Sequence, residues 1–225
     1  MTIKIGVPSK GRLRKDVLKV FKNNKYNLVS ERGKRDYFAK VKNKANLEII
    51  YLHAREIIER LGDNSLDIGF SGYDLLKEAP INIQKKISVF KKYNFGNAKL
   101  VVAIPNKWID VQTIADLEEI SFEFKENKKQ RLRVATKYPN LTRDFLFSKG
   151  VTQFKLVNSL GATETYPFTG SSEIITDITS TGETLRANNL RILKDGEILK
   201  SQACLMQSKL STKKAGIKKI IKLLT

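Results

Sequence analysis

Short β-type runs alternate with helical patterns along most of this chain, and that alternation limits the folds it can adopt. The runs "IKIGV" (3–7) and "LEIIYL" (47–52) have the composition of buried strands. After the first, Val17, Leu18 and Phe21 fall at helical spacing, and the helical pattern "AREIIERL" (54–61) follows the second. Strands alternating with helices indicate α/β units with mainly parallel sheets.

The same pattern continues to the end of the chain. The stretch "LDIGFSGYDLL" (66–76) predicts a strand, a glycine turn and a helix, whereas the polar stretch "SFEFKENKKQR" (121–131) predicts an exposed loop or an edge hairpin. About ten strands are many for one compact sheet, so we expect two smaller sheets with a cleft between them. The remaining predicted elements are strands at 99–105, 132–136, 153–158, 173–178 and 202–207, and helices at 141–150 and 213–224.

Composition limits the kind of protein. The net charge is +19, but the basic residues are scattered from Lys4 to Lys222 and do not interleave with aromatic residues, so we expect no nucleic-acid partner. No apolar run approaches the roughly 20 residues of a membrane span, and "MTIKIGVPSKGR" has no apolar segment typical of a signal peptide. A single cysteine, Cys204, fits a reducing cytoplasm, and one histidine with one cysteine makes a zinc site improbable.

The segment "TDITSTGETLRANNL" (176–190) joins a predicted strand to a predicted helix. Gly182 lets a phosphate approach the backbone closely, and the N–H groups at the start of the helix attract an anion. Ser180, Thr181 and Thr184 add hydroxyl donors, and Asp177 can accept hydrogen bonds from two sugar hydroxyls. The alternative is a capping box that needs no ligand, with Ser180 as N-cap and Glu183 three residues later.

The order Asp-x-x-x-Thr-Gly-x-Thr at 177–184 resembles the phosphoribosyl diphosphate loop of phosphoribosyltransferases. Together with six further motifs, it resembles ATP phosphoribosyltransferase, the first enzyme of histidine biosynthesis, over nearly the whole chain. Those motifs are "SKGRL" (9–13), "LDIGFSGYD" (66–74), "FGNAKLVVAIP" (95–105), "RVATKYPNLT" (133–142), "GATETYP" (161–167) and "SQACLMQ" (201–207).

The resemblance implies two α/β domains of the periplasmic-binding-protein type II kind, with the active site in the cleft. We expect residues 1–93 and 193–225 to form domain I, and residues 94–192 to form domain II with the phosphoribosyl diphosphate loop. The chain ends soon after "SQACLMQ" and one helix, as in the short form of the family. The short form implies a regulatory subunit similar to histidyl-tRNA synthetase, and a homodimer of catalytic chains is compatible with it.

The implied reaction joins N1 of the adenine of ATP to C1 of the ribose of phosphoribosyl diphosphate and releases pyrophosphate. It needs no protein nucleophile, and Mg²⁺ is held mostly by the substrates, so no metal ligands are assigned. By resemblance, the catalytic residues are Arg12 and Arg35, the latter on the departing pyrophosphate. The implied phosphoribosyl diphosphate site comprises Asp177, Thr179, Ser180, Thr181, Gly182, Glu183 and Thr184, and the implied ATP site comprises Lys10, Gly11, Arg12, Gly72, Asp74 and Glu164.

Several of these assignments have plain structural alternatives. Arg35 also reads as a solvated charge in a basic loop, and Gly72 with Asp74 as a turn glycine and a helix-start acid. The sequence departs from the family at "HAREII", where either His53 or Arg55 takes the place of a family arginine. Glu173 stands where aspartate is commoner. A non-catalytic binding module of the same fold is the alternative function.

Overall fold

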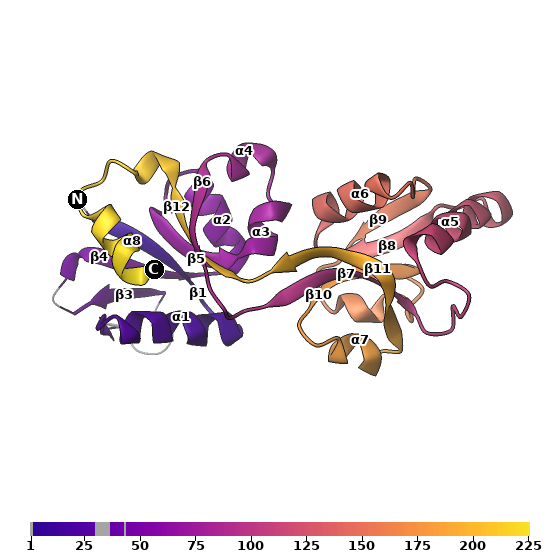
Figure 1. Ribbon diagram of the computed structural model, residues 1–225, viewed down its shortest axis with the longest axis horizontal. Coiled ribbons are helices and arrows are strands. Elements are labelled where there is room, and N and C mark those ends of the chain that lie inside the picture. The colour runs from indigo at the N-terminus through magenta and orange to yellow at the C-terminus, as the bar shows by residue number, and fades with distance from the viewer. Residues whose placement is uncertain (1, 30–36, 43) are drawn as a thin grey trace. The chain divides into compact units, whose positions relative to one another are not determined.

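The chain divides into two compact units in the computed structural model, which describes residues 2–29, 37–42 and 44–225, with the side chain of residue 45 left out. Unit 1 comprises Met1–Asn97 and Gln202–Thr225, and unit 2 comprises Ala98–Ser201. The chain therefore leaves unit 1 once and returns to it near its end (Figure 1).

Unit 1 is built around a seven-stranded sheet of order β2-β3-β4-β1-β5-β12-β6. Its elements are β1 (Ile3–Pro8), α1 (Gly11–Asn23), β2 (Leu28–Val29), β3 (Phe38–Val41), β4 (Lys44–Leu52), α2 (Ala54–Gly62), β5 (Ile68–Gly72), α3 (Tyr73–Glu78), α4 (Ile81–Gln84), β6 (Ile87–Lys92), β12 (Ala203–Ser208), the 3₁₀ turn η2 (Lys209–Ser211) and α8 (Ile217–Leu224).

Unit 2 is built around a five-stranded sheet of order β11-β7-β10-β8-β9. Its elements are β7 (Ala98–Pro105), α5 (Ile114–Lys128), β8 (Leu132–Thr136), α6 (Pro139–Ser148), β9 (Phe154–Asn158), the 3₁₀ turn η1 (Thr163–Thr165), β10 (Ile174–Thr179), α7 (Glu183–Ala187) and β11 (Leu190–Ser201). The α6 helix starts two residues before the predicted 141 because Pro139 occupies its first turn.

The helices of unit 1 cover both faces of its sheet. Val17 and Phe21 of α1 and Ile217 and Ile220 of α8 enter one apolar cluster with the strands. The α2, α3 and α4 helices pack in a second cluster around Ile57. The helix α8 begins at Ile217, later than expected, because Gly216 precedes it with a left-handed φ of +82°.

Two sequence expectations were confirmed and one was wrong. The chain forms two sheets, and strands and helices occur where the apolar runs predicted them. The expectation of mainly parallel sheets was wrong, because parallel pairing is confined to β4-β1-β5 and to β10-β8-β9. The remaining strand pairs are antiparallel, since β12 returns to unit 1 against β5, and β7 and β11 run opposite to their neighbours.

The stretch 121–131 was also misjudged, because residues 121–128 belong to the helix α5. A capping box formed by Thr113 and Asp116 starts this helix ahead of the polar stretch, and Ile114 and Leu117 are buried. The second half of α5 is polar and lacks a clear amphipathic pattern. It remains helical because a helix that has already been nucleated at its first turn is extended at low cost.

The division into units falls at 97/98 and 201/202. The boundary expected at 192/193 lies inside β11, which pairs with β7 from Leu190 to Ser201 and so belongs to unit 2 as one strand. A boundary at residue 193 would divide the β11–β7 strand pair between the two units. The boundary therefore lies after β11.

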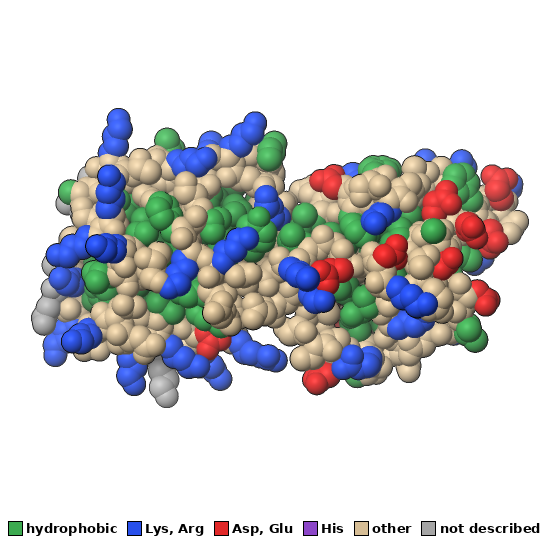
Figure 2. Space-filling view, in the orientation of Figure 1, with side chains coloured by type: hydrophobic (Ala, Val, Ile, Leu, Met, Phe, Trp, Pro, Cys, Tyr) green, Lys and Arg blue, Asp and Glu red, His purple; other side chains and the backbone are tan. Residues whose placement is uncertain are grey.

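Charge is unevenly divided between the units. Unit 1 has 27 Lys and Arg against 10 Asp and Glu, a net of +17, whereas unit 2 has 15 against 13, a net of +2. In Figure 2, Lys and Arg side chains crowd the surface of unit 1, and the Asp and Glu side chains in view gather on unit 2. The basic character of the chain is therefore a property of unit 1.

Candidate active site

The turn after β10 has the form of an anion-binding loop. Gly182 has a φ of +75° and immediately precedes α7. Its N–H donates to Oγ1 of Thr179 at 2.9 Å, and the N–H of Glu183 donates to Oγ1 of Thr181 at 3.3 Å. Two threonine hydroxyls therefore brace the turn, while Thr181, Glu183 and Thr184 stay exposed at its surface.

The capping-box alternative is wrong for this turn. Gly182, not Ser180, is the N-cap of α7, and this N-cap residue makes no side-chain hydrogen bond to the helix. A Cβ at position 182 would lie 3.0 Å from Nη1 of Arg186, so the guanidinium of Arg186 lies against the glycine. The sequence did not identify Arg186, although it lies four residues after Gly182 and thus on the same side of the short helix.

Asp177 lies on β10, just ahead of this loop. Its carboxylate Oδ1 accepts a hydrogen bond of 2.8 Å from the N–H of Ile178. Burial raises the pKa of Asp177, and two neighbouring charges act on it in opposite directions: Lys137 lowers the pKa, and Glu164 raises it. Asp177, Lys137 and Glu164 therefore share one electrostatic environment, although they come from three segments of unit 2.

The topology of the sheet explains this meeting. Strands β10, β8 and β9 run parallel, so their carboxyl ends lie at one edge. Lys137 follows β8 directly, and Glu164 lies in η1, which contacts β10. Ligand sites of α/β sheets lie at this edge. The sequence predicted Asp177 and Glu164 here but missed Lys137, whose only sequence signal was its place directly after a predicted strand.

A closed triangle of threonine hydroxyls lies beneath the site. Thr136 ends β8, Thr176 lies in β10, and Thr142 lies in the first turns of α6; all three are fully buried. The Oγ1 atoms of Thr142 and Thr176 are 2.6 Å apart, those of Thr176 and Thr136 are 2.6 Å apart, and those of Thr136 and Thr142 are 3.2 Å apart.

The triangle fixes the position of the charged residues above it. The N–H of Tyr138 also donates to Oγ1 of Thr136 at 2.8 Å. Lys137 and Asp177 are the next residues after Thr136 and Thr176, so the hydroxyl network holds the strand ends from which these two side chains project. No local sequence pattern links residues 136, 142 and 176, so the network was not predicted.

Unit 1 has a corresponding group of predicted residues at the carboxyl edge of β4-β1-β5, which are parallel. Lys10, Gly11 and Arg12 lie at the start of α1, directly after β1, and all three are exposed. Gly11 has a φ of +80°, and apart from its chain neighbours no atom of the described residues lies within 4 Å of where its Cβ would be. Open space around a left-handed glycine leaves the backbone here accessible to a ligand.

Gly72 and Asp74 form a turn at the end of β5, the neighbouring strand. Gly72 is the N-cap of α3, and a Cβ there would approach Oδ1 of Asp74 to 2.3 Å. Asp74 is buried at 7% exposure. A side chain at position 72 would displace the Asp74 carboxylate, which folds back over the glycine, and this contact gives the pair a structural role.

Of the remaining predicted residues, His53 and Arg55 are described by the structure and Arg35 is not. His53 is the exposed N-cap of α2, and its Nδ1 accepts a hydrogen bond of 3.3 Å from the N–H of Arg55. Both lie at the same edge of the sheet, directly after β4. Arg35 lies outside the described residues, so its role remains a prediction from the resemblance.

Two other sequence features have structural roles. Glu173 forms a two-pronged ion pair with Arg133, with 2.6 Å between Oε1 and Nη2, at the amino ends of β10 and β8. It thus lies at the opposite sheet edge from the site. Cys204 is fully buried in β12, and burial raises the pKa of its thiol to about 11. Such a thiol is protonated at neutral pH and therefore a poor nucleophile.

The described residues contain neither a cluster of metal ligands nor a membrane-spanning helix. Among residues 2–29, 37–42 and 44–225, no group of three or more His, Cys, Asp or Glu side chains is placed to hold a metal ion. No helix within those same residues combines the length and apolarity required to cross a bilayer.

Comparison with known proteins first identifies the class of fold. The chain superposes on the ligand-binding core of GluR0 in complex with L-glutamate with a TM-score of 0.57 at 14% identity, covering 100% of this chain and 90% of that one. Its fold is therefore the two-unit α/β arrangement of the periplasmic-binding-protein type II kind.

A family model for ATP phosphoribosyltransferase (HisG) matches residues 53–225. The ATP phosphoribosyltransferase of Brucella melitensis is 43% identical over 94% of this chain and 92% of its own length. The ATP phosphoribosyl transferase (HisG:HisZ) complex from Thermotoga maritima contains a chain with a TM-score of 0.77 and 25% identity, covering 99% of this chain and 96% of that one. The chain belongs to the ATP phosphoribosyltransferase family.

Family membership determines the reaction. The phosphoribosyl group of phosphoribosyl diphosphate is transferred to N1 of ATP, which gives phosphoribosyl-ATP and pyrophosphate in the first step of histidine biosynthesis. The enzyme is thus a pentosyltransferase, and the alternative of a non-catalytic binding module is not favoured.

Proposed function

We propose that the loop after β10 binds the 5′-phosphate of phosphoribosyl diphosphate and that Asp177 binds its ribose hydroxyls. The observation that carries this assignment is the left-handed Gly182, braced by Thr179 and bordered by the guanidinium of Arg186. Ser180, Thr181 and Thr184 supply hydroxyl donors, and the N–H of Glu183 exchanges its 3.3 Å bond to Thr181 for the phosphate.

The charges around Asp177 suit the binding of both the ribose and the phosphate. A carboxylate accepts hydrogen bonds from ribose hydroxyls, and the charge of the adjacent Lys137 opposes the rise in the pKa of Asp177 that burial causes. Lys137 and Arg186 add positive charge near a doubly charged phosphate. We assign Glu164, whose charge acts on Asp177, to the ATP site.

Catalysis in this proposal is positioning and electrostatic stabilisation. The C1 carbon passes through an oxocarbenium-like state, so the enzyme holds two polyanions in line and stabilises the charge that grows on pyrophosphate. We assign Lys10, Gly11 and Arg12 to phosphates of ATP or of the diphosphate, and Gly72 with Asp74 to the ATP side. Arg35 is assigned to the departing pyrophosphate on the family resemblance alone.

Mg²⁺ is part of the substrate in this proposal. It bridges diphosphate oxygens and lowers their negative charge, and few protein ligands are needed for that task. We also propose a cytoplasmic location and a regulatory subunit similar to histidyl-tRNA synthetase. The partner is supported by the Thermotoga maritima neighbour, which is a HisG:HisZ complex, and a homodimer of catalytic chains is compatible with it.

The loop assignment is tested with two matched glycine variants. Gly182→Ala and Gly150→Ala place the same side chain at left-handed positions, with φ of +75° and +85°. Each costs about 1–2 kcal/mol of backbone strain, so their unfolding free energies are expected to fall alike. Only Gly182→Ala is expected to raise the KM for phosphoribosyl diphosphate, by about tenfold or more, in a coupled assay of phosphoribosyl-ATP formation. Equal KM values for the two variants contradict the assignment.

The leaving-group assignment has its own test. Arg35→Ala is expected to lower kcat more than it raises the KM for ATP, because the arginine acts on charge that appears in the transition state. The opposite result moves Arg35 out of the leaving-group site. Each assay is run with and without the regulatory subunit, so that partner-dependent activity is distinguished from lost activity.

A further inference from the structure

The two helical layers of unit 1 differ in charge. Helices α1 and α8 pack on one face of the seven-stranded sheet, and α2, α3 and α4 pack on the other. Residues 209–225 contain six lysines and no acidic residue, whereas residues 54–84 contain three basic and six acidic residues. A bias toward lysine in the whole chain would raise the lysine content of both helical layers alike. It therefore does not explain why the two layers differ in charge.

The excess of lysines in this layer lies on the solvent-exposed sides of α1 and α8. We call the basic face the set of exposed side chains Lys15, Lys19 and Lys22 on α1 and Lys218, Lys219 and Lys222 on α8. Within the part of the chain that the structure describes, only Lys19 of these six has an acidic partner, Asp16, at 2.9 Å. The other five charges repel one another, and no acidic side chain among the described residues pairs with them.

A notch in unit 1 adjoins this face. It has a volume of about 190 Å³ and lies between α8 and the start of β4. Its lining includes Tyr26, Lys44, Asn46, Leu47, Lys219 and Leu223.

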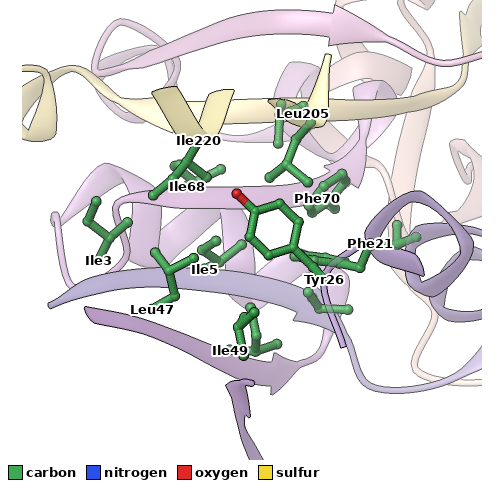
Figure 3. Packing of buried hydrophobic residues seen from close by; sticks show 14 of the residues in the cluster. Ile3, Ile5, Phe21, Tyr26, Leu47, Ile49, Ile68, Phe70, Leu205 and Ile220 are labelled. Atoms are coloured by element: carbon green, nitrogen blue, oxygen red, sulfur yellow. The ribbon is translucent and has the colours of Figure 1, made fainter. Parts of the chain in front are cut away.

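A buried phenol points into the notch. Tyr26 is 7% exposed, and its hydroxyl makes no hydrogen bond with any described residue. Figure 3 shows the hydroxyl pointing away from Ile49 and toward the side of the cluster where Ile220 of α8 lies. Burial raises the pKa of Tyr26, which keeps the hydroxyl protonated and able to donate.

The notch is suited to a carboxylate on a short apolar stem. Lys44 and Lys219 provide two ammonium groups, Tyr26 provides a hydroxyl donor, and the start of α8 lacks a side-chain cap. Leu47 and Leu223 form apolar walls that suit the methylene groups of an Asp or Glu side chain. A nucleic-acid phosphate has no such stem, and among the described residues of α1 and α8 no aromatic side chain is exposed for base stacking.

We propose that the basic face and its notch form the docking surface for an acidic face of the regulatory subunit, with one Asp or Glu side chain seated in the notch. This inference rests on the partner proposed above and names the surface of this chain that the partner contacts. Complementary charge at such a surface raises the association rate and makes binding sensitive to salt.

The test compares two triple charge reversals in the full-length enzyme. Lys218→Glu, Lys219→Glu and Lys222→Glu change the basic face, and Lys107→Glu, Lys149→Glu and Lys155→Glu change exposed lysines of unit 2 by the same charge. Binding to the purified regulatory subunit is measured by biolayer interferometry at low and high salt. We expect the first variant to bind at least tenfold more weakly with a flattened salt dependence, and the control to bind like wild type.

Single variants test the notch within the same measurement. Tyr26→Phe removes only the hydroxyl, and we expect a loss of affinity of about threefold to tenfold. Phosphoribosyl-ATP formation by the isolated chain and circular dichroism show whether each variant is folded.

The outcomes separate the partner from the surface. If the α8 triple variant binds the regulatory subunit as tightly as wild type does, the proposed docking surface is wrong, whereas the proposed partner still holds. No binding by wild-type enzyme overturns both, while activity of the isolated chain still supports the proposed reaction. A fluorescent DNA duplex that binds wild type at physiological salt and competes with the subunit for these lysines overturns the protein-docking assignment in favour of nucleic acid.

Discussion

The hydroxyl groups of Thr142 and Thr176 lie 2.6 Å apart in the interior of unit 2, although 34 residues separate them in the sequence. The first belongs to α6 and the second to β10, and Thr136 of β8 closes the ring. One helix and two strands are therefore joined by side chains alone at the sheet edge where Asp177 lies.

Thr142→Val keeps the shape of the side chain and removes one corner of the ring. Thr176 still donates to Thr136, but the hydroxyl hydrogen of Thr136 loses Thr142 as its acceptor, and a buried donor left unsatisfied costs about 1–3 kcal/mol. We expect the unfolding free energy to fall by that amount in urea denaturation. Thr142→Ser retains the hydroxyl and is the control. A valine variant as stable as wild type would show that the ring does not stabilise unit 2.

Asp177→Asn separates stability from binding. Burial raises the pKa of Asp177 above its ordinary value of 3.8, so the folded state holds this proton more tightly than the unfolded state. The contribution of Asp177 to the unfolding free energy is therefore present at low pH and is lost as the pH rises from 3.8 through the folded-state pKa. The variant has no such loss.

We therefore expect Asp177→Asn to melt at a higher temperature than wild type at neutral pH, with the difference shrinking as the pH falls. The same variant should bind phosphoribosyl diphosphate about 10–100-fold more weakly, because charge-assisted hydrogen bonds of about 1.5–3 kcal/mol are lost. Calorimetry across pH and isothermal titration check the two parts. A lower melting temperature at neutral pH would contradict the stated effect of burial.

Lys214 anchors the C-terminal segment to unit 1. Its Nζ lies 2.7 Å from Oδ2 of Asp67, which is 1% exposed and also accepts from the N–H of Lys4 at 2.9 Å. Lys214→Met leaves a buried carboxylate without its counter-ion, at a cost of about 3 kcal/mol. We expect faster amide hydrogen exchange in α8. Lys213→Met, an exposed neighbour, is the control, and similar exchange in both variants would rule out the anchor.

Cys204 provides a test of the inert-thiol interpretation. Because burial raises the pKa of its thiol to about 11, only a minute fraction is thiolate at neutral pH. We expect no reaction with a thiol reagent until the protein unfolds, and near wild-type activity for Cys204→Ala. Rapid labelling of native enzyme together with loss of activity would assign the thiol a functional role.

Local sequence patterns were sufficient for features contained within a few residues. The apolar runs identified β1, β7 and β10, because a buried strand can be recognised from the composition of five to eight consecutive residues. The turn at 177–184 was identified in the same way, since Gly182 and its flanking hydroxyls are adjacent in the chain. The capping-box alternative failed there because a glycine in the left-handed conformation, rather than Ser180, precedes α7.

Features that depend on distant segments were missed or misjudged. The helix α5 starts from a capping box at Thr113, and its first N–H donates to Asp195, 81 residues away, at 2.8 Å. The polar stretch 121–131 contains neither contact. Sheet direction was misjudged for a similar reason, because the return of β12 beside β5 is decided by the path of the whole chain.

The sequence by itself determined most of the strands and helices, the position of the glycine turn at 177–184 and the resemblance that named the reaction. Only the tertiary structure decided that Lys137 acts on Asp177, that three threonines close a ring beneath them, and that the excess lysines lie over α1 and α8. The physical reason is the distance along the chain over which each interaction acts. Periodicity, glycine conformation and capping act over a few residues, whereas electrostatic fields and buried hydrogen bonds act between side chains that only strand pairing brings together.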